Sequence, residues 1–150
     1  MKPTIYEAMG GAEAVLALAH AWHRRCLDDP ILSHAFDGEI HAEHSERLAA
    51  YWAEQLGGPS AYTESMGGYS HVVRVHSGNG PHEHMDGRGV AAFVAALGDV
   101  GISEDPDLRF QLVAWFTWAT AMLNHRWDSP GEVPDDLELP SWDWNGTEGW

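Results

Sequence analysis

Cysteine is nearly absent from this sequence of 150 residues, in which Cys26 stands alone. A single thiol excludes an internal disulfide framework and a metal site built from several thiolates. Because Cys26 lies in an apolar helical stretch, we expect a buried and unreactive thiol. A chain of this length buries roughly 70% of its unfolded surface, so it can form one stable domain without cross-links.

Long apolar runs and basic residues are also scarce. No run of about 18 apolar residues occurs, and the first residues lack the apolar core of a signal peptide, which predicts a cytoplasmic protein without a membrane partner. Lysine and arginine number 8 against 23 acidic residues, for a formal charge of −15. Since such a surface repels polyanions, we expect no nucleic acid partner either.

Strand-like alternation is missing as well, and the sequence predicts an all-α architecture. Apolar residues recur at helical spacing between glycine and proline breaks. Asp29 and Asp105 each precede a proline and are expected to cap helices. The expected helical ranges are 4–9, 12–27, 30–36, 41–56, 61–66, 71–76, 86–100 and 106–126.

The composition changes after residue 127. Residues 128–150 contain three prolines, seven acids, no base, and Trp142, Trp144 and Trp150. Acidic composition favours disorder, but three tryptophans are too many for a solvated tail. We therefore expect a helical domain over 1–127 and a tail over 128–150 that packs on the domain or extends from it, with Trp142 or Trp144 packed.

Histidine, with ten residues, is unusually abundant and suits metal ligation and proton transfer. The stretch from His71 to His76 lies between a glycine turn and a loop rich in breakers, and two histidines five apart do not share a helix face. We expect His76 to point inward. A non-haem metal site formed by His71, His76, His82 and His84 is the alternative. No Glu-x-x-His spacing supports it.

Several segments, in this order and at this spacing, carry a resemblance to one family. The sequence from about residue 6 to residue 123 resembles the truncated haemoglobins, specifically their group II branch. This resemblance implies a truncated globin fold, a two-over-two helical sandwich around haem b. The matching segments are Tyr6–Gly11, Asp28–Leu32, Glu46–Leu48, Gly57–Pro59 and Tyr62–Glu64, followed by His76 at the spacing of the proximal histidine.

The resemblance also implies a role for individual residues. His76 would be the proximal ligand of the haem iron, and Phe36, Leu48, Tyr62 and Arg74 would contact the cofactor, Arg74 near the propionates. His23 and His44 would line the distal side with Leu48.

Three positions depart from the family pattern. The family usually has tyrosine in place of His23, a small residue in place of His44, and a tryptophan where this chain has only Gly89 and Val90.

Two distal histidines leave the chemistry open. They could donate hydrogen bonds to O₂ or a related diatomic ligand, close the iron as a sixth ligand, or act as acid–base groups toward peroxide. The protein is then an O₂ carrier or an oxidoreductase (NO dioxygenase or peroxidase-like) that needs a reductase or an oxidant, and it is a monomer or a homodimer. A globin-fold interaction module without haem is a further alternative, against which Phe36 and His76 speak.

Overall fold

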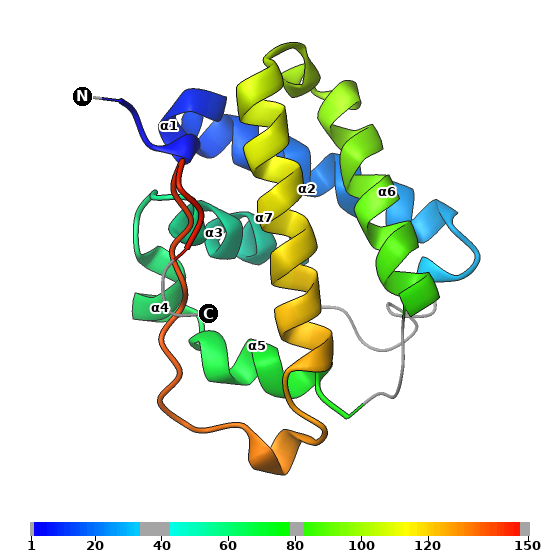
Figure 1. Cartoon of the computed structure of the whole chain (residues 1–150), viewed down its shortest axis with the longest axis vertical. Helices are drawn as coiled ribbons and strands as arrows, with labels where there is room; N and C mark the ends of the chain where they lie inside the picture. Colours follow the sequence, from blue (N-terminus) through cyan, green and yellow to red (C-terminus); the bar gives the residue numbers. More distant parts are fainter. Residues whose placement is uncertain (1, 34–42, 79–82, 148–150) are drawn as a thin grey trace.

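A computed structural model describes residues 2–33, 43–78 and 83–147 of the chain (Figure 1). Within these ranges the regular elements are helical, and one isolated bridge joins Asp143 to Gly146. The prediction of an all-α architecture is confirmed for these residues. The elements are α1 (Ile5–Met9), α2 (Gly11–Asp28), α3 (His44–Gln55), α4 (Ala61–Ser65), α5 (Tyr69–His76), α6 (Glu83–Asp99), η2 (Ile102–Glu104), α7 (Pro106–His125) and η3 (Pro130–Glu132).

Local capping explains where these helices begin. At α1, the Thr4 hydroxyl accepts a hydrogen bond from the Glu7 backbone N–H at 3.1 Å, and the Glu7 carboxylate accepts one from the Thr4 N–H at 3.4 Å. At α7, the Asp105 carboxylate accepts from the backbone N–H groups of Asp107 and Leu108 at 3.1 and 3.2 Å. The predicted cap at Asp105 is therefore confirmed.

Helices α2 and α3 form one pair and α6 and α7 form another, and the two pairs enclose one aromatic core. The helix α2 packs against α3 and α6, and α6 packs against α7, in the crossed arrangement visible in Figure 1. Phe93 of α6 stacks on Phe116 of α7 with ring centroids 4.1 Å apart, and Trp52 of α3 meets Trp115 and Phe116 edge-on at 5.8 Å. These rings join α3, α6 and α7 in one core.

Residues 128–147 form what we call the C-terminal strap. Figure 1 shows the strap leaving the end of α7, passing α5 and α4, and ending near α1. Trp142 donates its backbone N–H to the Gln55 carbonyl at 2.6 Å, and the Trp144 indole N–H donates to the Pro3 carbonyl at 2.7 Å. The strap therefore contacts both α3 and the N-terminal segment, whereas Trp150 lies outside the described residues.

The structure shows the surroundings of the single cysteine and the character of the helices. Cys26 is fully buried, and this burial raises the pKa of its thiol to about 12. A thiol with such a pKa stays protonated and unreactive near neutral pH, as predicted. In the part of the chain that the structure describes, no helix is long and apolar enough to cross a membrane.

Candidate functional site

The two histidines expected on the distal side lie in contact. His23 comes from α2 and His44 from the first turn of α3, and their Nδ1 atoms are 3.3 Å apart. The rings meet edge-to-face, with centroids 4.7 Å apart and an interplanar angle of 72°. Ser45, which the sequence did not single out, places its hydroxyl 3.3 Å from His23 Nδ1. The crossing of α2 and α3 therefore builds a paired-imidazole site.

Burial favours the neutral form of His23. His23 is partly buried, and this desolvation lowers the pKa of its imidazole. Electrostatic repulsion from the nearby His20 lowers the pKa further, by a smaller amount. A neutral imidazole offers one N–H donor and one acceptor, whereas a protonated ring offers only donors. His23 thus remains neutral at pH 7 and can share a hydrogen with His44.

Leu48 and Tyr62 belong to different surroundings. Leu48 follows His44 by one helical turn, is partly buried, and packs against the core. Tyr62 of α4 is buried and meets Tyr51 of α3 edge-on at 5.3 Å, and Tyr51 in turn stacks on Tyr69 of α5 at 6.4 Å. Leu48 therefore shares the helix face of His44, whereas Tyr62 joins a tyrosine cluster that connects α3, α4 and α5.

His76, the predicted proximal ligand, occupies the last position of α5 with one ring nitrogen already engaged. Its Nδ1 donates to the Val72 carbonyl at 2.8 Å, because a carbonyl oxygen can only accept. The hydrogen is thereby fixed on Nδ1, and Nε2 keeps a lone pair, the tautomer that ligates metals. Desolvation by burial lowers the pKa of His76, which favours the neutral form needed for ligation.

A carboxylate near His76 escaped the sequence analysis. Asp86 of α6 favours the charged form of His76 and so opposes the effect of burial on its pKa. Asp86 itself accepts hydrogen bonds from Asn124 Nδ2 and His125 Nε2, both at 2.6 Å. These residues lie far apart in the sequence, so only the meeting of α6 with the end of α7 reveals the cluster.

Arg74 contacts the C-terminal strap. Its guanidinium donates to the Val133 carbonyl at 3.0 Å and forms an ion pair with Asp135. Arg74 precedes His76 by two residues, which on a helix is a rotation of about 200° and places the two side chains on opposite faces. The structure therefore gives Arg74 a partner in the strap, and the expected propionate contact stays a prediction from the resemblance.

This chain has a glycine, Gly89, at the position where the family usually has a tryptophan. Gly89 is buried, and a Cβ built there would meet only Leu32 Cδ2, at 3.9 Å. The Trp22 indole N–H donates to the Gly89 carbonyl at 3.1 Å. An indole has one donor, so Trp22 does not supply a free N–H in place of the missing tryptophan.

The remaining predicted site residues are Phe36 and the histidines of the alternative non-haem metal site. Phe36 lies outside the described residues, as does His82 of the alternative metal cluster. His71 and His84 are exposed, and no group of three or more His, Cys, Asp or Glu side chains within the described ranges could hold a metal ion. The structure thus offers the non-haem metal site no support in the part that it describes.

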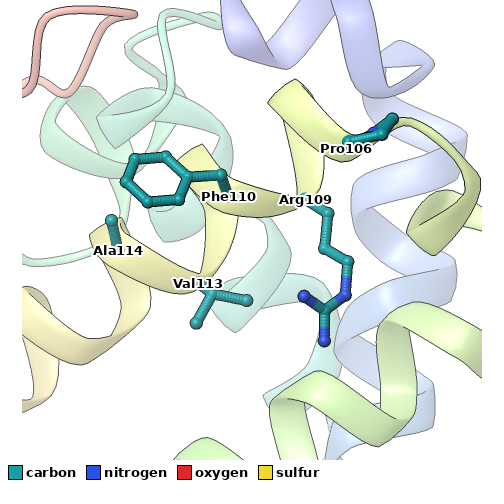
Figure 2. Close-up of a pocket in the computed structure, with 5 residues that line it drawn as sticks. All are labelled: Pro106, Arg109, Phe110, Val113 and Ala114. Carbon is teal, nitrogen blue, oxygen red and sulfur yellow. The ribbon is translucent and has the colours of Figure 1, made fainter.

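An open hollow on the outer side of α7 is separate from these histidines. Figure 2 shows the hollow, whose lining residues all belong to α7 and whose apolar wall includes Phe110, 69% exposed. It contains no metal-ligating or nucleophilic side chain. The lining residues are Pro106, Arg109, Phe110, Val113 and Ala114.

The helical fold described above is the predicted truncated globin fold, as comparison with known proteins shows. A family model described as bacterial-like globin matches residues 4–121. The chain therefore belongs to the bacterial-like globins, a family of haem and ligand binders, and its relatives of known structure include group II truncated haemoglobins. The strap lies beyond the matched residues.

Solved structures support the same fold. A thermostable hemoglobin from the actinobacterium Thermobifida fusca is 27% identical, with a TM-score of 0.70 and coverage of 83% of this chain and 99% of that chain. The group II truncated hemoglobin from Bacillus anthracis is 20% identical, with a TM-score of 0.73 and coverage of 89% and 99%. A truncated oxygen-avid haemoglobin from Bacillus subtilis is also 20% identical, with a TM-score of 0.70 and coverage of 82% and 100%.

The donor set fits the haem that the family implies. His76 presents a neutral imidazole whose Nδ1 hydrogen is held by a backbone carbonyl, and this leaves Nε2 as a ligand. Among the described residues, no hydrogen bond engages Nε2. A single strong axial histidine is the ligation that globins use. His76 therefore has both the tautomer and the protonation state that the family's cofactor needs.

Proposed function

We propose that this chain binds haem b through Nε2 of His76 and holds O₂ or a related diatomic molecule on the side lined by His23, His44 and Leu48. Haem, when bound, supplies one coordination position for a diatomic ligand, whose fate depends on the polarity of its surroundings. The observation that carries the proposal is the Nδ1–H bond from His76 to the Val72 carbonyl at 2.8 Å.

The chain's own residues divide the work. His76 anchors the cofactor, and the carbonyl that holds its Nδ1 hydrogen orients the ring and raises its basicity. On the distal side, His44 or His23 donates a hydrogen bond to the diatomic molecule. Because the bound molecule gains negative charge, this hydrogen bond is stronger than one to a neutral group. Leu48 contributes apolar surface that keeps water away.

A second candidate function is redox catalysis. The contact of 3.3 Å between the Nδ1 atoms of His23 and His44 favours it, because hydrogen-bonded imidazoles can accept and return a proton. NO dioxygenation or peroxide-dependent oxidation would then need a reductase or an external oxidant as partner. In either role we propose a cytoplasmic protein, monomeric or homodimeric.

Removal of the His76 ring and chemical replacement of it test the first proposal. The wild-type protein should bind one haem per chain, with a Soret band and a ferrous form that takes up CO and O₂. His76→Gly should lose this spectrum, and added imidazole should restore it because the free ring fills the vacated space. The matched control is His71→Gly, which removes an exposed histidine from the same helix and should bind haem normally.

The outcomes separate cleanly. Full haem occupancy with an unchanged spectrum in His76→Gly would disprove His76 as the ligand. Failure of the wild-type protein to bind added haem would remove the globin function altogether.

A further inference from the structure

The strap holds the middle of α5 through Arg74. This side chain donates to the Val133 carbonyl at 3.0 Å and pairs with Asp135. Val133 is 5% exposed and belongs to the core, whereas the Asp135 side chain is 95% exposed. The bond to a backbone carbonyl next to a buried anchor therefore gives the contact its position, and the exposed ion pair adds little to the stability.

The strap also contacts α5 near both ends. The buried Ser70 hydroxyl accepts a hydrogen bond from the Leu137 backbone N–H at 3.0 Å. Just past the other end, Gly78 lies so close to the strap that a Cβ there would be 3.0 Å from Pro130 Cδ and 3.3 Å from the Asp128 carbonyl oxygen. Later residues of the strap contact earlier residues of α5. The two segments therefore run antiparallel along the whole helix.

These contacts lie on one face of α5, and the haem-ligating nitrogen of the proposed function lies on the other. Ser70 and Arg74 are four residues apart and share a face, as do Val72 and His76. The two pairs are offset by two residues, a rotation of about 200°. The strap therefore supports α5 from behind the face that carries His76.

The helix needs such support because it is short. With 8 residues it is below the length of about 12–15 residues at which isolated helices become stable in water. It packs against α7 and against η3 of the strap, and Tyr69 at its start stacks on Tyr51 of α3, so the position of α5 depends on these three contacts.

We propose that the C-terminal strap is a proximal buttress, which holds the face of α5 opposite His76 and so fixes the position of the His76 imidazole, with Arg74 as the positioning residue. The inference rests on the proposed function, since it takes His76 as the haem ligand. It assigns a task to a segment that lies outside the matched globin residues 4–121.

The full-length variants Arg74→Gln and Asp135→Asn test the buttress in three ways. The first is amide hydrogen exchange of α5 in the haem-free protein. The second is the rate of haem loss to an excess of a haem-scavenging apoprotein, and the third is the Fe–His stretching band of the ferrous protein. Loss of the Arg74 contacts should speed both α5 exchange and haem loss about fivefold and shift or broaden the Fe–His band. Asp135→Asn should have a smaller effect, and Arg74→Lys should restore part of the loss.

A matched control is Asp99→Asn, which breaks the ion pair with Arg25 at 2.6 Å between α6 and α2. It should leave α5 exchange, haem loss and the Fe–His band at wild-type values. Unchanged α5 exchange in Arg74→Gln would overturn the buttress. Faster exchange with unchanged haem loss and an unchanged Fe–His band would overturn the positioning role. Normal haem binding in either case leaves the proposed function standing, whereas a wild-type protein without haem would overturn both.

Discussion

Replacement of Trp142 by alanine should show how strongly the strap is attached at its far end. The indole N–H donates to Gln111 Oε1 at 3.0 Å, and the ring packs on Trp118 with centroids 5.5 Å apart. The hydrogen bond is worth about 1 kcal/mol, and the aromatic pair adds about 0.5–1.5 kcal/mol beyond its buried area. The loss of the apolar area that the half-buried ring removes from water adds to these two contributions. Trp142→Ala should therefore lower the free energy of unfolding by about 3 kcal/mol, near the lower end of the values for replacing a buried tryptophan by alanine.

Thermal unfolding followed by far-UV circular dichroism measures this loss. For a chain of this size each kcal/mol lowers Tm by about 2–4 °C, so Trp142→Ala should lower it by roughly 6–12 °C. Trp142→Phe keeps a ring on Trp118 and loses only the N–H, so about 1 kcal/mol is expected. Leu27→Ala, at a residue 50% exposed, is the control and should stay within about 0.5 kcal/mol of wild type. A Tm of Trp142→Ala equal to that of Leu27→Ala would refute the packing role of the strap tryptophan.

Two further predictions concern the distal histidines. His44→Ala should speed O₂ dissociation by about tenfold or more, because a charge-assisted hydrogen bond is worth about 1.5–3 kcal/mol, and an unchanged rate in stopped-flow measurements would exclude His44 as a donor. His23→Gln should flatten the acid side of the stability profile. Since the folded-state pKa of His23 is lowered from 6.5, the unfolded chain takes up the proton first and wild-type stability falls as the pH drops below that value. Parallel denaturation midpoints for the two proteins from pH 7.5 to 5.5 would count against a neutral His23.

Local patterns in the sequence predicted the helices well because their signals lie within a few residues. Asp105 and Pro106 predicted a helix over 106–126, and α7 spans Pro106–His125. The hydrogen bonds of the predicted cap at Asp29 are also present, since its carboxylate accepts from the Ile31 and Leu32 N–H groups at 2.8 and 3.0 Å. The helix predicted over 30–36 lies partly outside the described residues. The breaks at glycine and proline likewise separate the observed elements.

Contacts between distant residues could not be predicted in this way. The partner of Arg74 lies 61 residues later, and no local pattern distinguishes an arginine that meets a strap carboxylate from one that meets a cofactor carboxylate. Asp86 near His76 depends on how α6 meets the end of α7. The family resemblance placed His23 and His44 on the same side of the cofactor, but their direct contact appears only in the structure.

The geometry of the histidine pair links the two coordination states that the sequence left open. A hydrogen bond between two Nδ1 atoms requires a hydrogen on one of them and a lone pair on the other. If His44 carries the Nδ1 hydrogen, its Nε2 has a lone pair and can act as a metal ligand; if His23 carries it, His44 Nε2 bears a hydrogen and can donate to a diatomic molecule. The Ser45 hydroxyl near His23 Nδ1 can donate or accept, so it is compatible with both tautomers. In the proposed function, movement of one hydrogen between two nitrogens therefore decides whether His44 closes the site or supports the ligand in it.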